Sequence, residues 1–288
     1  MARLVIRHRT TYRYRAPVHL GPHRLMLRPR ESCDLTLASF RLSIQPEAVI
    51  SWAHDVFGNA VATATVADMT DRLLIESVSE IELQSVAWPV FDIAASAISY
   101  PFRYSDEEWT DLGALAAPCY ADPTSRLAQW ARGFVAGNPT DTLSLLKDLS
   151  AGVTMWVSYQ SRDAEGTQSP GQTLDRGWGS CRDLAVLFVE AARSLGFGAR
   201  IISGYLHDPD GVLDGSSGSG STHAWAEVYV PGAGWITFDP TNRSVGSFNL
   251  VPVAVARDIA QTVPVSGSFS GGADLSADMT VEVEVRPL

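Results

Sequence analysis

The stretch that decides the fold is Gly177-Trp178-Gly179-Ser180-Cys181-Arg182-Asp183, which runs directly into the apolar segment 184–195. After the cysteine, apolar residues recur at three- and four-residue steps, which is the period of a helix with one buried face. They are Leu184, Leu187, Phe188, Ala191 and Leu195. Gly196 and Gly198 follow and signal the end of the helix. The pattern therefore predicts a helix that begins at Cys181.

Cys181 has the surroundings of a reactive thiol. At a helix start, unpaired backbone N–H groups and the helix dipole favour negative charge. This placement lowers a thiol pKa from about 8.5 toward neutral pH. Gly177 and Gly179 leave room for a bent backbone and for a substrate to approach. A buried, inert cysteine is the common alternative, but a glycine-rich turn beside a helix start favours a nucleophile.

A histidine and an aspartate follow in the chain, each on a predicted strand. Residues 223–230 alternate between apolar and polar, residues 235–239 form a second such run, and Pro231-Gly232-Ala233-Gly234 is a turn signal between them. These features predict a hairpin. A cysteine nucleophile needs a base and a group that orients the base. His223 and Asp239 are the candidates, although a lone core histidine beside a surface aspartate is also common.

The register of the hairpin decides whether these two residues meet. Simple pairing about the turn places Asp239 opposite Ala226 rather than His223, so we expect a bulge or a slipped register. Glu227 competes as the orienting carboxylate, because strand alternation puts it on the same face as His223. Asp183 lies in the first turn of the predicted helix, where we expect it to interact with the dipole rather than to act as a catalytic acid.

Four blocks of this sequence resemble the core of the transglutaminase-like superfamily, over roughly residues 140 to 245. They are 177–183 with its helix, Gly196–Tyr205, Thr222–Tyr229 and Gly234–Thr241. The resemblance implies a transglutaminase/papain-like core in which Cys181 is the nucleophile, His223 the base and Asp239 its orienter. The reaction stays open, because the family includes transamidases, deamidases, amidases and peptidases.

The N-terminal part predicts a different architecture. Residues 3–15 alternate between an apolar face and an arginine face, which indicates a strand with a basic, solvated outer face. Runs 35–44, 60–66 and 73–83 predict further short strands. We therefore expect an α+β protein with an N-terminal antiparallel β-sandwich, residues 1–95. Residues 96–288 would form the catalytic core, which we expect to include the C-terminal strands.

Three N-terminal blocks resemble the region that precedes the core in bacterial members of the family. They are residues 8–18, Arg28-Pro29-Arg30 and Asp55-Val56-Phe57-Gly58-Asn59. The resemblance implies no chemistry for this region, and the residues suggest none.

The segments around the predicted site have simpler interpretations. Residues 88–101 look like a linker, while 125–135 and 140–153 have the cap and spacing of helices that pack around the cysteine helix. Residues 158–173 are polar and predict an exposed loop. Gly215–Ser221, directly before His223, is either a substrate-admitting lid or an ordinary solvent loop.

Four aromatic residues are candidates for the site. The Tyr159 hydroxyl or the Trp156 indole N–H would help the Cys181 backbone N–H to stabilise an oxyanion, as the resemblance implies, with core packing as the alternative for both. Trp178 and Trp225 flank the predicted triad and would form apolar walls that restrict water. Filling the core is their alternative role.

Composition and charge narrow the class of protein. With 45% hydrophobic and 19% charged residues, the chain is that of a globular protein. Its net charge of −10 argues against general nucleic-acid binding. Residues 1–7 begin a strand rather than a signal peptide, and no run approaches the length of a membrane span. Cys33, Cys119 and Cys181 are too few and scattered for a disulfide framework, so we expect a cytoplasmic protein.

We expect a cysteine-dependent enzyme that transfers or hydrolyses acyl groups through a thioester. The expected partner is a protein or peptide with an amide or glutamine side chain, and not a nucleic acid or a membrane. No Cys-x-x-Cys spacing exists, and a scattered cysteine, histidine and aspartate are weak evidence for zinc, so the sequence implies neither a metal nor a cofactor. The alternative is a non-catalytic interaction module that keeps the fold. Substrate, oligomeric state and the choice between hydrolysis and transamidation stay open.

Overall fold

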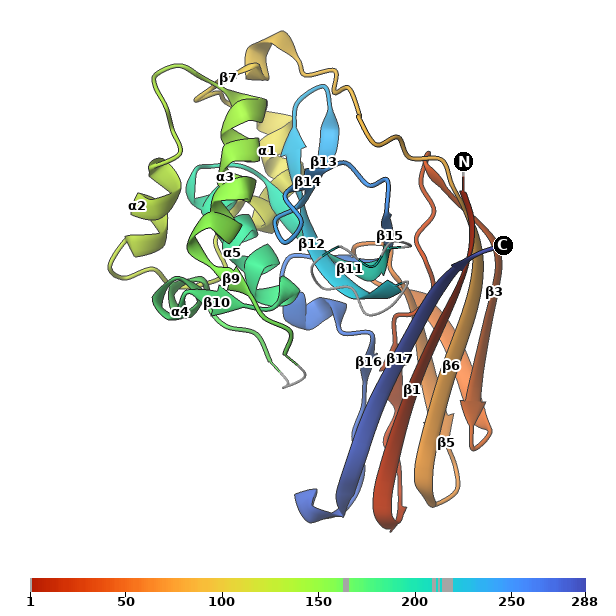
Figure 1. Cartoon of the computed structure of the whole chain (residues 1–288). Coiled ribbons are helices and arrows are strands. Elements are labelled where there is room, and N and C mark those ends of the chain that lie inside the picture. The colour runs from red at the N-terminus through yellow and green to blue at the C-terminus, as the bar shows by residue number, and fades with distance from the viewer. Residues whose placement is uncertain (1, 163–165, 209–210, 212, 214–219) are drawn as a thin grey trace.

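The N-terminal part consists of two four-stranded antiparallel sheets, seen on the right of the computed structural model (Figure 1). The structure describes residues 2–162, 166–208, 211, 213 and 220–288. One sheet has the order β17-β1-β6-β3 and the other β16-β2-β5-β4. Their strands are β1 (Ala2–Val18), β2 (His23–Leu25), β3 (Leu35–Gln45), β4 (Ala48–His54), β5 (Ala60–Val66), β6 (Thr70–Leu83), β16 (Val265–Ser266) and β17 (Ser276–Pro287).

The predicted sandwich is confirmed, because the two sheets enclose one apolar core. Tyr14 of β1 and Ile75 of β6 meet Leu25 of β2 and Ala62 of β5 in this core. The alternating apolar residues of the first strand point inward as the period of two requires. The predicted basic outer face is neutralised by its neighbours: Arg7 and Arg9 bind Glu76 of β6 at 2.9 and 2.7 Å.

The last two strands, β16 and β17, lie in these N-terminal sheets, whereas the earlier strand β15 lies in the core sheet. β17 pairs with β1 along its length, and both chain termini lie at the same end of this sheet (Figure 1). β16 likewise pairs with β2. β17 covers an edge of β1 that would otherwise expose unpaired backbone groups. We therefore propose an N-terminal module made of residues 1–95 together with the C-terminal strands.

The core half is a five-stranded antiparallel sheet with helices against it (Figure 1). The sheet order is β14-β13-β12-β11-β15. Its strands are β11 (Ala199–His207), β12 (Gly220–Val230), β13 (Gly234–Asp239), β14 (Ser244–Val245) and β15 (Leu250–Ala256), and the helices are α1 (Asp106–Leu112), α2 (Arg126–Arg132), α3 (Thr142–Trp156), α4 (Pro170–Arg176) and α5 (Cys181–Ser194). Short elements complete the chain: η1 (Ala95–Ala97), β7 (Ser99–Tyr100), η2 (Gly113–Ala116), β8 (Thr140–Asp141), β9 (Ser158–Tyr159), β10 (Trp178–Gly179), η3 (Ile259–Thr262) and η4 (Ala273–Leu275). None of the helices in the described residues has the length and apolarity of a membrane span.

Helix α5 begins at Cys181, as the sequence predicts, but it is buried on every side rather than on one face. All its residues from Asp183 to Arg193 are buried, because β11 and β12 cover one side and α2, α3 and α4 the other. Its charged residues are paired, as a low-dielectric interior demands. Glu190 and Arg193 form an ion pair of 2.7 Å, and Glu190 also accepts the backbone N–H of Cys119 at 2.8 Å.

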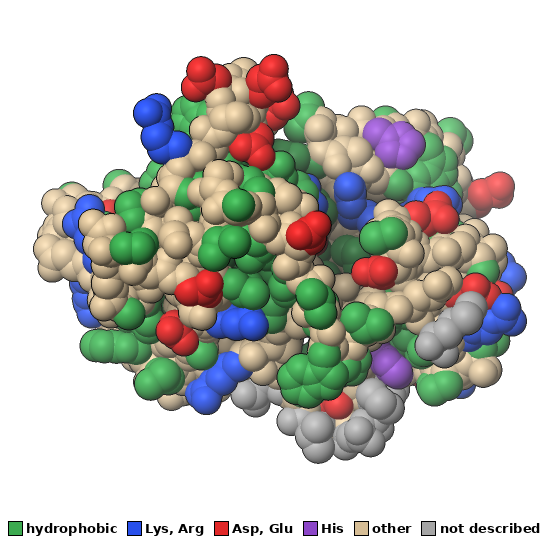
Figure 2. All heavy atoms as spheres, turned by 90° about the horizontal axis from the view of Figure 1, so that it is seen from above, with side chains coloured by type: hydrophobic (Ala, Val, Ile, Leu, Met, Phe, Trp, Pro, Cys, Tyr) green, Lys and Arg blue, Asp and Glu red, His purple; other side chains and the backbone are tan. Residues whose placement is uncertain are grey.

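The N-terminal module and the core share an apolar junction. Leu4 and Ile6 of β1 belong to one buried cluster with Tyr205 of β11 and Val251 of β15. His8 is buried at the same junction, with Nδ1 3.1 Å from the Tyr205 hydroxyl. Residues 84–94 then cross from β6 to the helical side (Figure 1). Hydrophobic and charged side chains are interspersed over the surface seen from above (Figure 2).

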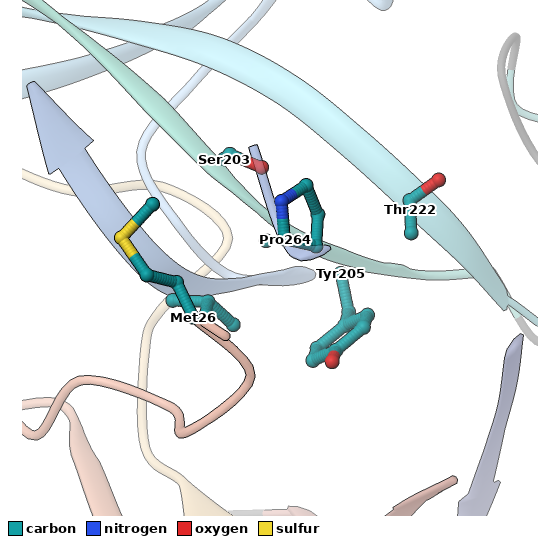
Figure 3. Close-up of a pocket in the computed structure, with 7 residues that line it drawn as sticks. Met26, Ser203, Tyr205, Thr222 and Pro264 are labelled. Carbon is teal, nitrogen blue, oxygen red and sulfur yellow. The ribbon is translucent and has the colours of Figure 1, made fainter. Parts of the chain in front are cut away.

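The cavity drawn in Figure 3 lies at this junction, between Met26 and Pro264 on one side and Ser203, Tyr205 and Thr222 on the other. Its volume is about 10 Å³. That is room for about one water molecule. This cavity is therefore too small to be a substrate site.

Candidate active site

Cys181 is the first residue of α5, directly after the N-cap Ser180. Its side chain is half-buried against the main apolar core. The polypeptide before it is fixed, because the Asp183 carboxylate accepts the backbone N–H of Ser180 at 2.8 Å and its hydroxyl at 2.9 Å. The sulfur thus lies at the end of the helix where the dipole favours a negative charge.

His223 and Asp239 come together as neighbours in the sheet, on β12 and β13. Nε2 of His223 lies 2.9 Å from Oδ2 of Asp239, and both side chains are buried. Asp239 also accepts the side-chain amide of Asn242 at 2.8 Å and the backbone N–H of Thr241 at 3.0 Å. The carboxylate is therefore held in one orientation by three partners, and the imidazole is held by the carboxylate.

Nε2 of His223 is taken by Asp239, and Nδ1 has no hydrogen-bond partner in the described part of the chain. The Cys181 sulfur lies near enough to the His223 side chain and to the Ala224 backbone N–H for both to lower the thiol pKa. β13 pairs with β12 only as far as Ala226, which leaves the Ala224 region of the strand open to the start of α5.

The electrostatics of this group favour a charged pair. Burial raises the pKa of the Cys181 thiol, but its hydrogen bond and charge attraction to His223 outweigh burial, so the pKa lies below its ordinary value. Burial likewise lowers the pKa of His223, yet the charge and hydrogen bond of Asp239 raise it to about 10. Asp239 keeps a pKa below its ordinary value, because the attraction of His223 overcomes burial. These directions favour a thiolate of Cys181 and an imidazolium of His223 beside the Asp239 carboxylate.

His223 and Asp239 come within reach of each other through a slipped register of the hairpin. The pairing of β12 and β13 contains no bulge. Ala226 pairs with Phe238, so the same register carried one step further places Asp239 beside Trp225. Side chains two residues apart on one strand share a face, and diagonal neighbours across a sheet remain within reach of long side chains. Asp239 therefore reaches His223 diagonally, over the same face as Trp225.

Glu227 does not orient His223, although it lies on the same face. Its carboxylate binds Arg200 of β11 at 2.6 Å, and the Arg200 guanidinium stacks on the Trp235 ring at 4.0 Å. The competing carboxylate is thus occupied by an arginine on the neighbouring strand.

Asp183 does more than interact with the helix dipole. Its fully buried carboxylate accepts Arg162 Nη2 at 2.9 Å and the Gln168 backbone N–H at 2.7 Å, besides its two bonds from Ser180. The predicted exposed loop of residues 158–173 is therefore wrong at Gln168, which is only 2% exposed. Asp183 joins that segment to Ser180, the residue before Cys181.

The two glycines before Cys181 have structural rather than substrate-related roles. Gly177 has a φ of 67° and ends α4 in the left-handed conformation. A Cβ on Gly179 would lie 2.8 Å from the Asp183 Cβ. The space at Gly179 is thus filled by the buried aspartate, which corrects the expectation that both glycines make room for a substrate.

The four aromatic candidates lie in different settings. Tyr159 is half-buried on β9, paired with Gly179 two residues before Cys181, and Trp178 is half-buried on the neighbouring β10. Trp225 is buried, with its ring 6.1 Å from that of His223 and nearly parallel to it. Trp156 is 65% exposed at the end of α3, so core packing does not describe it. Most of the lid candidate (214–219) lies outside the described residues.

Asn242, Arg162 and Gln168 are site residues that sequence reasoning missed. Asn242 carried a local signal, because an aspartate followed by Pro-Thr-Asn is typical of a turn closed by side-chain hydrogen bonds. Arg162 and Gln168 carried no local sequence signal, because their partner Asp183 lies 21 and 15 residues further along the chain.

Known families match both halves of the chain. Residues 4–82 match the bacterial transglutaminase-like N-terminal region, and residues 128–240 match the transglutaminase-like superfamily core. An uncharacterized protein of Mycobacterium leprae, ML0607, is 26% identical over 98% of this chain and 99% of its own length. The Bacillus subtilis protein YebA, also uncharacterized, is 35% identical over 22% of this chain and 9% of its own length.

A solved structure shares the fold of the whole chain. The crystal structure of a candidate cysteine protease from Cytophaga hutchinsonii has a TM-score of 0.76 and 21% identity, and the similarity covers 99% of this chain and 90% of that one. Together with the two matched regions, this likeness extends from the first strand to the last. The chain thus carries a region that matches the transglutaminase-like superfamily core, preceded by one that matches the bacterial transglutaminase-like N-terminal region.

Proposed function

We propose that this protein is a cysteine-dependent enzyme that transfers or hydrolyses acyl groups at amide bonds. The observation that carries the proposal is the buried pair of His223 and Asp239, with Nε2 2.9 Å from the carboxylate, close to the Cys181 thiol at the start of α5. Cys181 is the nucleophile, His223 the acid and base, and Asp239 the group that orients the imidazole and stabilises its cation.

In the first half of the cycle the Cys181 thiolate attacks the carbonyl carbon of a carboxamide. The C=O electron pair moves to the oxygen, and N–H groups at the start of α5 bind this oxyanion, a contribution of about 3–4 kcal/mol. As the oxyanion collapses, the C–N bond breaks and imidazolium His223 gives its proton to the leaving nitrogen. Ammonia or an amine departs, and a thioester remains on Cys181.

The second half of the cycle decides the product. Neutral His223 takes a proton from water or from a primary amine, whose oxygen or nitrogen attacks the thioester carbonyl. The C–S bond then breaks, and the thiolate and imidazolium are restored. Water gives hydrolysis or deamidation, while an amine gives a new amide.

The aromatic residues support this chemistry in proposed secondary roles. Tyr159 is the better side-chain candidate for the oxyanion site, because β9 pairs it with Gly179 close to the nucleophile. Trp225 lies over the His223 ring and shields the imidazole from water. Trp178 forms part of the wall before the helix start. Trp156, largely exposed, is the weaker oxyanion candidate.

The substrate we propose is a protein or peptide that presents a glutamine side chain or another amide. We place the activity in a reducing compartment, the cytoplasm, because a disulfide at Cys181 would abolish the nucleophile and all three cysteines are free.

Peptide-bond cleavage is the second candidate reaction. The observation that favours it is the fold likeness to the candidate cysteine protease of Cytophaga hutchinsonii.

The test is to incubate the protein with a glutamine-containing peptide, with and without a primary amine, and to measure ammonia and peptide masses. Ammonia with a gain of the amine's mass indicates transamidation, and ammonia alone indicates deamidation. Fragments without ammonia indicate a peptidase. Cys181→Ala should abolish each activity while Cys33→Ala, at an exposed cysteine, should leave it unchanged. Absence of any turnover together with slow alkylation of Cys181 would favour a non-catalytic interaction module.

A further inference from the structure

Two N-terminal sequence blocks, which the proposed reaction does not use, enclose a cavity in the N-terminal module. Arg28-Pro29-Arg30 lies on one side and the turn from His54 to Ala60 on the other. The cavity has a volume of about 180 Å³. It is lined by Arg28, Pro29, Arg30, Glu31, His54, Gly58 and Ala60. We call it the arginine cavity.

The guanidinium of Arg30 is held in place before any ligand arrives. Its Nη1 donates to the Phe57 carbonyl at 3.1 Å and to Asn59 Oδ1 at 2.7 Å. Asn59 is fully buried and is itself fixed by β15, because its side-chain amide donates to the Val255 carbonyl at 2.7 Å and accepts the Val255 N–H at 2.9 Å. Arg30 therefore has little freedom to lose on binding.

The carboxylates near the cavity have partners of their own or are partly exposed. Asp55 is committed to its own turn, accepting the backbone N–H groups of Phe57 and Asn59, and it lies 3.5 Å from Arg24. Glu31 lines the cavity, but its side chain is 55% exposed and its nearest approach to Arg28 is 4.0 Å. Burial and the nearby Arg200 lower the pKa of Arg30, while Glu227 and Asp55 act in the opposite direction.

We propose that the arginine cavity binds a small oxyanion through Arg28 and Arg30, with His54 at its rim. A guanidinium presents paired N–H donors that match the oxygens of a phosphate or a carboxylate. The cavity has room for such a group together with bound water. This site is independent of the proposed acyl transfer, since none of its residues belongs to the triad.

The experiment titrates the whole chain with inorganic phosphate in a calorimeter at constant ionic strength, and in parallel with acetate. Saturable binding of phosphate with weaker binding of acetate identifies a phosphate group, and the reverse order identifies a carboxylate; either supports the site. Arg28→Gln should weaken binding about tenfold, since it removes a charged hydrogen bond. His54→Gln should weaken it less.

The matched control is Arg15→Gln, which removes the same charge from an exposed position of β1. It should leave binding unchanged. Arg28 is half-exposed and makes no hydrogen bond to Asn59, so we expect Arg28→Gln to fold. Arg30→Lys keeps the positive charge but removes the paired N–H donors of the guanidinium, and it tests whether binding needs that pair. No saturable binding of either anion, or equal binding by the wild type and Arg28→Gln, would overturn the proposal.

Discussion

The reactivity of Cys181 depends on one neighbour, His223. The thiol pKa lies below its ordinary value and the imidazole pKa is about 10, which favours an ion pair of the two side chains. The rate at which iodoacetamide alkylates Cys181 should therefore fall less between pH 8 and pH 6 than that of an ordinary thiol, which loses about tenfold per pH unit. Burial raises the pKa of Cys119, so it serves as the internal comparison. Peptide mass spectrometry measures both rates, and parallel pH profiles would contradict the ion pair.

Asp239→Asn tests the second link of the same chain. The amide keeps the shape of the carboxylate but removes the charge that holds the imidazole protonated, so the pKa of His223 should fall and that of Cys181 should rise. At pH 7 we expect turnover to fall at least about 100-fold. The alkylation rate of Cys181 should also become pH-dependent. Glu227→Gln is the matched control, because Glu227 binds Arg200 and should leave both readouts unchanged.

Sequence alone located Cys181, His223 and Asp239, since each lies at the edge of a strand or helix with a strong pattern. It did not locate Asn242, Arg162 or Gln168. Their partners are set by how loops return to the start of α5, and loop paths leave no periodic signal. The roles of all these residues stay proposals until turnover is measured.

The start of helix α5 is an element fixed by Asp183, which accepts hydrogen bonds from the N-cap and from the loop at 162–168. Asp183→Ala would leave the Arg162 guanidinium and the Gln168 N–H without their acceptor. Loss of one partner of a buried pair costs about 3–5 kcal/mol of unfolding free energy. Urea unfolding should show this loss, whereas Asp148→Ala, at an exposed site of α3, should change stability little. Equal stabilities would mean that water replaces the carboxylate.

The close approach of strands β11 and β15 at Gly204 can be tested in the same way. A Cβ there would lie 2.0 Å from the Val251 carbonyl oxygen of β15 and 2.8 Å from the Trp225 ring. Gly204→Ala should therefore force β11 and β15 apart, at a cost of about 1–3 kcal/mol. Gly171→Ala in α4 is the control, since a Cβ there meets nothing within 4 Å. Thermal unfolding should separate the two variants clearly; equal midpoints would show that β15 shifts freely.

Local periodicity predicted the existence of most elements but not their surroundings. The period of α5 marked a helix and could not show that polar residues such as Glu190 and Arg193 are paired inside. The hairpin was foreseen, yet its register depends on a one-residue step that turn residues alone do not fix. The partner of β17 was missed, because strand pairing across more than 250 residues is a property of topology.

At the scale of the whole molecule, the N-terminal module is fastened to the core by residues of its recognisable sequence blocks. Asn59 bonds to the backbone of β15, and His8 bonds to Tyr205 of β11. β11 is paired with β12, which carries His223. The module thus supports the sheet that holds the proposed base. This contact is a structural role for the sequence blocks that contain His8 and Asn59.

The junction also makes the stability of the molecule depend on pH through His8. Burial lowers the pKa of His8 to about 4, while a histidine in the unfolded chain titrates near 6.5. Between these values the unfolded state binds a proton that the folded state does not. Stability contributed by neutral His8 is therefore fully present above pH 6.5 and is lost as the pH falls toward 4. The loss amounts to about 3 kcal/mol.

Urea unfolding at pH 7, 5.5 and 4.5 measures this slope in the wild type and in His8→Gln. The variant should be less stable at pH 7, because the bond to Tyr205 is altered, but its stability should fall less on acidification. Other groups, including His23, whose pKa burial also lowers, titrate equally in both proteins and cancel in the difference. If the two curves run parallel, His8 is protonated in the folded state, and a neutral imidazole does not close the junction between the two halves.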